Sequence, residues 1–217
     1  MKKLVVLGGG ESGCGAAVLA QQKGYEVFLS DKGKIKEKYQ KVLTQFEIDF
    51  EEKKHTEYRL FTADEVVKSP GIPDTIPLIL ELKEKGIPVI SEIEFAARYT
   101  EAKIVGITGS NGKTTTTLLI GHMLKKAGLN VGVAGNVGES FAMQVATEKH
   151  DLYVLELSSF QLDGIIDFKP DVAVLLNITP DHLDRYNNEM ENYIQSKFRI
   201  AMNQDKSHHL IYCADDQ

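Results

Sequence analysis

Two stretches decide the fold: LVVLGGGESGCGAA (Leu4–Ala17) and GITGSNGKTTTT (Gly106–Thr117). In each, a short apolar run leads into a glycine-rich loop, and the residues after the loop favour a helix. Glycines let the backbone turn tightly after a strand, and a helix N-terminus offers unpaired N–H groups to a phosphate. The sequence therefore predicts two phosphate-binding turns in one chain of 217 residues.

The first loop carries Gly8, Gly10 and Gly13, which fit the G-x-G-x-x-G pattern of dinucleotide-binding folds. Asp31 ends the next predicted strand, about twenty residues on, where an acid can bind a ribose or a base. A nicotinamide cofactor is the default interpretation, a UDP-sugar is its rival, and a tight turn without a ligand is the structural alternative. Cys14 is expected to be a packing residue, because no His or Lys is adjacent to it.

The second loop, Gly109–Thr114, has the sequence GSNGKT. The usual P-loop has a glycine where this sequence has Ile107, so the loop is compact. Its backbone N–H groups can hold phosphates, Lys113 can reach the terminal phosphate oxygens, and the Thr114 hydroxyl can bind Mg²⁺. The position between a strand and a helix makes this a strong signal for a nucleoside triphosphate.

Composition narrows the class of protein. The formal net charge of −6 argues against nucleic acid as the main partner, which would favour a basic face. No apolar run reaches about 18 residues, so the sequence predicts no membrane span. Cys14 and Cys213 are the two cysteines. They provide no disulfide framework, which predicts a cytoplasmic protein.

Strand and helix signals alternate along the chain, which predicts an α/β protein with parallel sheets covered by helices. In the first hundred residues, strands are expected at Lys3–Gly8, Glu26–Asp31, Glu65–Ser69 and Ile87–Ser91, and helices at Gly13–Lys23, Lys34–Gln45 and Ile76–Lys85. The pattern restarts near Arg98–Ala102. We therefore predict a Rossmann-like domain over 1–100 and a P-loop-type α/β domain over 101–217.

The second domain is expected to contain strands at Lys103–Thr108, Asn130–Gly135, Asp151–Ser158, Asp171–Thr179 and His208–Ala214, and helices at Thr114–Gly128 and Glu191–Asn203. In the first of these helices, the spacing of Leu118, Leu119, Met123 and Leu124 predicts one buried face. The chain ends on ADDQ just after a strand. This ending predicts an incomplete central domain and a fragment of a longer protein.

Several motifs, in order along the whole chain, resemble the Mur ligases of peptidoglycan synthesis. They are KSPGIP (Lys68–Pro73), the second phosphate loop, GNVG (Gly135–Gly138), LELSSFQLD (Leu155–Asp163) and NITPDHLDRY (Asn177–Tyr186). The run SSFQLD favours the family member that adds D-glutamate. The resemblance also answers why one chain needs two phosphate turns, because a ligase that uses ATP to activate a nucleotide-linked substrate needs both.

The resemblance implies an ATP-dependent ligase that adds D-glutamate to UDP-N-acetylmuramoyl-L-alanine through an acyl phosphate. Its partners would be these two small molecules, with no nucleic acid and no membrane, and the protein would be a cytoplasmic monomer. A third domain, absent from this chain, would carry much of the amino-acid site. The fragment alone is therefore expected to be inactive.

The resemblance assigns ATP binding to Gly109, Ser110, Asn111, Gly112, Lys113, Thr114 and Thr115. It assigns catalysis to Lys113, Glu156, His182 and Lys197, with two Mg²⁺ ions held by Thr114, Glu156, His182 and a carbamylated Lys197. The structural alternatives are a strand-end acid facing water for Glu156 and a solvated surface lysine for Lys197.

The resemblance assigns the UDP-substrate to Gly10, Glu11, Ser12, Asp31, Ser69, Gly71, Asn136, Ser158 and Gln161. A carboxylate beside a diphosphate is repulsive, so Glu11 is expected to contribute backbone contacts. Three alternatives stay open at this point. They are a sister Mur ligase that adds another amino acid, a nicotinamide-dependent oxidoreductase, and a non-catalytic nucleotide-binding switch.

Overall fold

The structure is a computed structural model that describes residues 1–215, so Asp216 and Gln217 of the ADDQ run lie outside it. The chain forms two units. The first comprises Met1–Tyr99 together with Ser140–Thr147, and the second comprises Thr100–Glu139 together with Glu148–Gln217. Each unit contains one five-stranded sheet in which every pairing is parallel. The predicted α/β class is confirmed.

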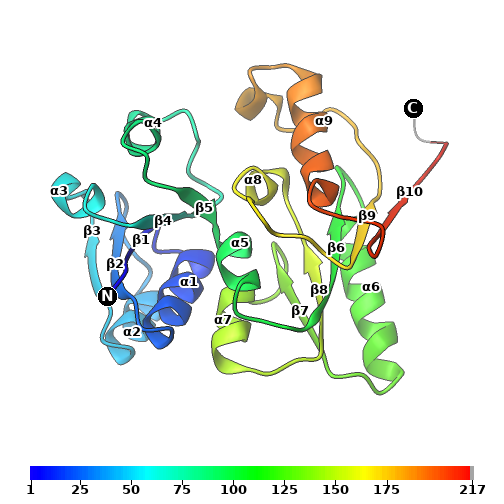
Figure 1. The fold of residues 1–217 in the computed structure, drawn as a ribbon, viewed down its shortest axis with the longest axis horizontal. Coiled ribbons are helices and arrows are strands. Elements are labelled where there is room, and N and C mark those ends of the chain that lie inside the picture. The colour runs from blue at the N-terminus through cyan, green and yellow to red at the C-terminus, as the bar shows by residue number, and fades with distance from the viewer. Residues whose placement is uncertain (216–217) are drawn as a thin grey trace. The chain divides into compact units, whose positions relative to one another are not determined.

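The first unit has the strand order β3-β2-β1-β4-β5, with β1 at the centre (Figure 1). Its elements are β1 (Lys3–Leu7), α1 (Glu11–Gln22), β2 (Glu26–Asp31), α2 (Glu37–Gln45), β3 (Asp49–Glu52), α3 (Glu57–Leu60), β4 (Glu65–Lys68), α4 (Pro77–Glu84), β5 (Val89–Ser91), α5 (Glu92–Ala97) and α7 (Phe141–Thr147). Strands β2 and β4 flank β1, so their carboxyl ends meet beside the first glycine loop.

Sequence patterns did not predict β3 or α7. Strand β3 has the sequence DFEE, which lacks the apolar run of its neighbours because it pairs only with β2 at the sheet edge. Helix α7 comes from the middle of the chain, yet it packs against α1 and α5 of the first unit. Its docking requires close approach, since a β-carbon at Gly15 would lie 2.0 Å from Ser140 Oγ.

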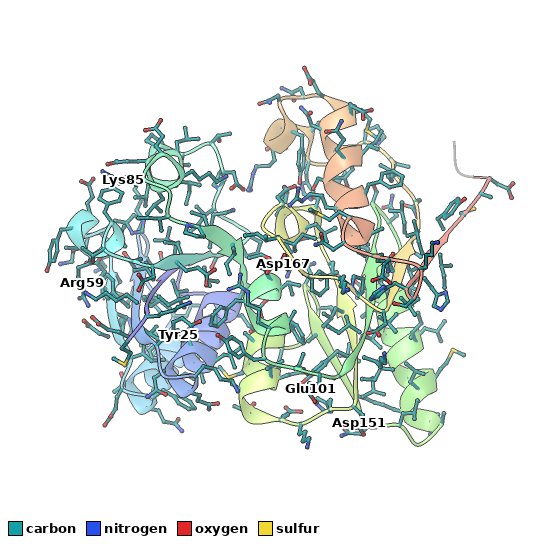
Figure 2. The ribbon with its side chains drawn as sticks, in the orientation of Figure 1. Tyr25, Arg59, Lys85, Glu101, Asp151 and Asp167 are labelled. Carbon is teal, nitrogen blue, oxygen red and sulfur yellow. The ribbon has the colours of Figure 1, made fainter. Side chains whose placement is uncertain are left out.

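An aromatic cluster fixes α5 within the first unit. The ring of Tyr25, labelled in Figure 2, packs edge-on against Phe95 at a centroid distance of 5.7 Å. The Tyr25 hydroxyl also lies 2.8 Å from the hydroxyl of Tyr99. Such a pair satisfies the polar ends of two large apolar side chains, which lets both rings contribute to the core.

The second unit has the strand order β10-β9-β6-β8-β7, with β6 at the centre. Its elements are β6 (Lys103–Thr108), α6 (Lys113–Lys126), β7 (Val131–Gly135), β8 (Leu152–Glu156), α8 (Ser159–Leu162), β9 (Val172–Leu175), a 3₁₀ turn at Leu183–Tyr186, α9 (Met190–Phe198), a 3₁₀ turn at Arg199–Ala201 and β10 (His209–Tyr212). Strand β9 is shorter than predicted, because the chain after Leu175 leaves the ladder and contacts the second loop.

The predicted buried face of α6 is confirmed at Leu124 and wrong at its other three residues. Leu118, Leu119 and Met123 are 50%, 54% and 60% exposed. The helix instead packs on the sheet through Thr117, Ile120, Gly121 and Leu124. A β-carbon at Gly121 would lie 2.5 Å from Val133, so the helix approaches the sheet closely at a small residue. The apolar pattern missed this stripe because two of its four positions are threonine and glycine.

Among residues 1–215, no helix is both long enough and apolar enough to cross a membrane.

A buried carboxyl group holds the N-terminus of α7. One oxygen of Glu92 accepts hydrogen bonds from Ser140 Oγ (2.8 Å) and the Ala142 amide (2.6 Å). The other oxygen is buried and has no hydrogen-bond partner in the described part of the chain. Burial raises the pKa of Glu92 to about 7, although the bonds from Ala142 and Ser140 oppose the shift. Between pH 4.5 and about 7, the Glu92 carboxyl is therefore protonated in the folded protein and ionised in the unfolded chain.

We predict that Glu92→Gln removes one component of the pH dependence of stability. Stability from Glu92 is fully present below its ordinary pKa of 4.5 and is lost as pH rises through about 7. The free energy of unfolding of the variant, relative to wild type, should therefore rise between pH 5 and pH 8 by on the order of 1–3 kcal/mol. Urea unfolding at both pH values measures it, with Glu57→Gln at an exposed position as control. An equal difference at both pH values would show that the Glu92 carboxyl titrates normally.

Candidate functional site

The first glycine loop has no space for side chains at its base. Gly8 has a φ of +98°, and a β-carbon at Gly13 would lie 1.9 Å from the Gly8 carbonyl oxygen. At Gly10, the N-cap of α1, a β-carbon would meet nothing within 4 Å. The loop is thus tightly folded against its own backbone and open at Gly10, where the α1 N-terminus can meet an anion.

The end of β2 holds this loop in place. The two carboxylate oxygens of Asp31 accept hydrogen bonds from the Gly9 amide (2.5 Å) and the Gly33 amide (2.6 Å). The carbonyl oxygen of Ser30 accepts the Gly8 amide at 2.9 Å. Asp31 therefore has a structural role that the motif did not indicate, and its contact with a base stays a prediction.

Other predicted residues of the first site lie around the same edge of the sheet. The Ser69 amide, just after β4, donates to the Leu7 carbonyl oxygen at 2.9 Å, and Gly71 is exposed. Glu11 and Ser12 form the first turn of α1. The Glu11 carboxylate accepts the hydroxyl hydrogen of Tyr39 on α2 at 3.1 Å. It is thus engaged by the neighbouring helix.

The second loop wraps around the ammonium group of Lys113. Gly109 and Gly112 have φ angles of +151° and +83°, which L side chains rarely adopt. Lys113 Nζ donates to the carbonyl oxygens of Gly109 and Ser110, both at 2.9 Å. Thr114 and Thr115 are exposed on the first turn of α6, so their hydroxyl groups are accessible at the helix N-terminus.

The segment after β9 fastens the second loop, and sequence reasoning missed this role. The Asn177 side chain accepts the Asn111 amide at 2.9 Å and donates to its carbonyl oxygen at 3.1 Å. Ser110 Oγ donates to the Thr179 carbonyl oxygen at 2.8 Å and accepts the Thr179 amide at 2.9 Å. The sequence did contain a signal for this role, the polar run Asn-x-Thr at the end of a strand. That strand lies next to the central strand, and the loops of a parallel sheet meet at the carboxyl ends of its strands.

Glu156 ends β8 directly beside the second loop, in register with Ile107 of β6 and Gly135 of β7. The side chain is buried, so the alternative of an acid facing water is wrong. Its Oε1 accepts a hydrogen bond from Asn136 Nδ2 at 2.7 Å. Its Oε2 is buried without a hydrogen-bond partner in the described residues. A buried carboxylate oxygen of this kind suits a cation.

Lys197 is buried on α9, with 1% of its surface exposed, so the alternative of a solvated lysine is wrong. Its Nζ donates to the Gly109 carbonyl oxygen at 2.8 Å and lies 4.5 Å from the centre of the Tyr193 ring. Burial and the nearby Lys113 ammonium lower the pKa of Lys197 to about 8. The sequence held a signal for this burial: Tyr193, Ser196, Lys197 and Ile200 are the buried residues at helical spacing.

The remaining predicted residues have other local contacts. The His182 side chain is 59% exposed and lies near Asp181 and the ring of Phe160. Ser158 and Gln161 form a capping box at the start of α8, in which each side chain accepts the other residue's amide. Their spacing, Ser-x-x-Gln before a helix, was the sequence signal for this cap. A contact of these residues with a sugar stays a prediction.

The donors beside the second loop fit one of the Mg²⁺ ions that the resemblance implies. Within residues 1–215, no three His, Cys, Asp or Glu side chains gather as a ready-made metal site. Glu156 supplies one free carboxylate oxygen beside a loop suited to phosphate. Mg²⁺ bound to nucleotides takes most of its remaining ligands from phosphate and water, so this donor set fits a nucleotide-bound ion.

We predict that Gly135→Ala destabilises the second unit far more than Gly128→Ala. Both glycines have positive φ angles, +102° and +84°. A β-carbon at Gly135 would lie 2.3 Å from the Glu156 carbonyl oxygen, whereas one at Gly128 would meet nothing within 4 Å. The Gly128 variant should lose about 1 kcal/mol from backbone strain alone, and the Gly135 variant at least about 2 kcal/mol more. Urea unfolding of both variants measures this, and equal losses would contradict the close approach of β7 to β8.

Known families match this chain in two parts. The MurD N-terminal domain matches residues 3–76, and the Mur ligase middle domain matches residues 107–217. The chain is 63% identical over 216 residues to UDP-N-acetylmuramoylalanine–D-glutamate ligase of Christiangramia forsetii. It is 62% identical to the ligase of the same name from Bacteroides fragilis. These alignments cover 100% of this chain but 48% and 49% of the relatives. The chain thus spans about half the length of these relatives.

Solved structures share the fold at lower identity. The UDP-N-acetylmuramate:L-alanyl-gamma-D-glutamyl-meso-diaminopimelate ligase of Neisseria meningitides matches with a TM-score of 0.68 at 22% identity, over 100% of this chain and 72% of that one. UDP-N-acetylmuramate-alanine ligase MurC of Thermotoga maritima matches with a TM-score of 0.61 at 22% identity, over 100% of this chain and 50% of that one. The two domain matches, and the identity to the relatives over the whole of this chain, show that this chain belongs to the Mur ligase family. It comprises a MurD-type N-terminal domain and a Mur ligase middle domain.

Proposed function

We propose that the protein carrying this chain is an ATP-dependent ligase that joins D-glutamate to UDP-N-acetylmuramoyl-L-alanine. The choice of amino acid rests on the names of the relatives that are more than 60% identical. The chain spans about half their length. The complete activity therefore belongs to a protein of the relatives' full length.

One observation carries the proposal of phosphoryl transfer. The Lys113 ammonium group donates to the carbonyl oxygens of Gly109 and Ser110, both at 2.9 Å. This cation, at the N-terminus of α6, creates a positive potential suited to a polyphosphate. A carboxylate can approach a triphosphate only where such cations offset the repulsion between the two anions.

In the proposed reaction, a carboxylate oxygen of the UDP-substrate attacks the γ-phosphorus of ATP and the bond to the ADP oxygen breaks. The amine of D-glutamate then attacks the acyl phosphate carbon, an amide forms, and phosphate leaves. Lys113 stabilises the transferring phosphoryl group. The backbone N–H groups of Gly109–Thr115 hold the other phosphates, while Asn177 keeps the loop in shape.

We propose that Thr114 and Glu156 hold one Mg²⁺, and that His182 and a carbamylated Lys197 hold a second. When bound, Mg²⁺ supplies charge that offsets the phosphate oxygens. An unmodified lysine ammonium has no lone pair for a metal, so the Lys197 role requires the carbamate. The buried position of Lys197 supports the proposal, because burial favours an uncharged amine, and only the uncharged amine reacts with CO₂.

We assign the UDP-substrate to the first loop and its neighbours: Gly10, Glu11, Ser12, Asp31, Ser69 and Gly71. The proposal also assigns UDP-substrate binding to Asn136, Ser158 and Gln161. The meeting of β1, β2 and β4 at one edge supports the first six. We also propose that the protein is a monomer and acts in the cytoplasm.

We predict that Lys113→Ala, in a protein of the relatives' full length, lowers the rate of ligation at least about a hundredfold, because the variant loses a cation at the transferring phosphoryl group. Binding of the UDP-substrate should be largely unchanged. Lys125→Ala, an exposed lysine at the other end of α6, is the matched control and should retain the wild-type rate. Amide formation at the normal rate in the Lys113 variant would show that the P-loop assignment is wrong.

We further predict that this chain binds UDP-N-acetylmuramoyl-L-alanine but not NAD⁺. Parallel calorimetric titrations separate the ligase from the nicotinamide-dependent oxidoreductase, since each has its own ligand for the first loop. Saturable binding of NAD⁺ alone would overturn the proposed function. An assay of the full-length protein with several amino acids separates the D-glutamate ligase from sister Mur ligases.

A further inference from the structure

A buried lysine lies beside the first phosphate loop and has no place in the proposed chemistry. Lys68 is the last residue of β4, and 4% of its surface is exposed. Lysine side chains are rarely buried, because an ammonium group loses its hydration. Such a group is kept only where hydrogen bonds and an opposite charge replace the lost water.

Two partners of Lys68 lie in the segment that follows it. Its Nζ donates to the Ile72 carbonyl oxygen at 2.7 Å and lies 3.1 Å from Asp74 Oδ2. Asp74 also accepts a hydrogen bond from Lys83 of α4 at 2.9 Å. Burial alone would raise the pKa of Asp74, but the two lysines outweigh it and lower the pKa, so the Asp74 carboxyl is ionised at neutral pH. Lys68 thus connects the end of β4 to the segment that ends at Asp74.

That segment is packed onto the first glycine loop. Ser69 begins a turn that closes with a hydrogen bond from the Ile72 amide to the Ser69 carbonyl oxygen at 3.0 Å. The Ser69 amide bonds to Leu7 at the start of the loop, at 2.9 Å. A β-carbon at Gly8 would lie 2.5 Å from Ser69 Oγ and 3.6 Å from Ile72 Cδ1. The turn and the loop are therefore closely packed against each other.

We propose that Lys68 is a positioning residue for the UDP-substrate site. It holds the Ser69–Asp74 turn against the first phosphate loop, so that Ser69 and Gly71 keep their places beside the bound nucleotide. The inference rests on the proposed function, which assigns the UDP-substrate to this loop. Lys68 itself does not act on the ligand, because its ammonium group is buried and faces the turn.

The test measures the affinity of this chain for two ligands, UDP-N-acetylmuramoyl-L-alanine and Mg·ATP, by calorimetry. Lys68→Met keeps the apolar stem and removes the charge and the donors. We expect it to weaken binding of the UDP compound about tenfold, the loss of one charge-assisted hydrogen bond, and to leave the affinity for Mg·ATP unchanged. A general loss of folded protein would lower the number of binding sites measured for both ligands, so a loss of affinity confined to the UDP compound identifies positioning.

Lys83→Met is the matched control. Lys83 pairs with the same Asp74, but it is half-exposed and lies on α4, away from the Ile72 carbonyl. It should keep wild-type affinity for the UDP compound. Lys68→Arg retains a cation and donors, and should restore most of the affinity lost in Lys68→Met.

If Lys68→Met does not fold, Asp74→Asn tests the same inference. This variant removes the ion pair but leaves the bond from Lys68 to Ile72, and we expect it to lose about threefold in UDP affinity. Wild-type affinity in every folded variant of Lys68 and Asp74 would overturn the inference while leaving the proposed function intact. No binding of the UDP compound by the wild-type chain would overturn the proposed substrate site, and the inference with it.

Discussion

Both candidate sites depend on one steric constraint: where the chain turns at the end of a parallel strand, there is no space for a β-carbon. At Gly13 that carbon would lie 1.9 Å from the Gly8 carbonyl oxygen, and at Gly135 it would lie 2.3 Å from the carbonyl oxygen of Glu156. Because backbone meets backbone at these points, helix N-termini and strand-end side chains are brought to one edge of each sheet. The tight turns of the backbone, and not the reach of long side chains, set the positions of the polar groups at this edge.

Buried charges follow the same geometry. Lys197, Glu156, Glu92 and Lys68 are all at least nine-tenths buried. Each lies on, or just after, an element that borders a turn. Lys197 and Lys113 share the Gly109 carbonyl oxygen, Glu156 is held by Asn136, Glu92 holds the start of α7, and Lys68 holds the turn beside Gly8. Burying a charge costs free energy unless the charge is paired. The positions of these four side chains are therefore held at a cost in stability.

Strands and loops were largely predictable, while helix faces and connections were not. The apolar runs before Gly8 and Gly109 marked the central strands of both sheets. The amphipathic pattern failed at α6, where Leu118, Leu119 and Met123 are exposed and Thr117 and Gly121 meet the sheet. Apolar spacing reports hydrophobicity, but a helix that approaches a sheet closely needs small residues at the contact. The buried stripe that contains Lys197 was also present in the sequence, and the charge of the lysine concealed it.

The sequence by itself determined the parallel α/β architecture and the two glycine-rich turns, because glycines at fixed offsets after apolar runs allow few other backbone paths. Its motifs also identified the family. Only the tertiary structure decided that Ser140–Thr147 completes the first unit, that Asn177 and Thr179 fasten the second loop, and that Lys68 pins the turn beside the first. These contacts join residues through space. They depend on which strand ends lie side by side, and strand order is not encoded in local periodicity.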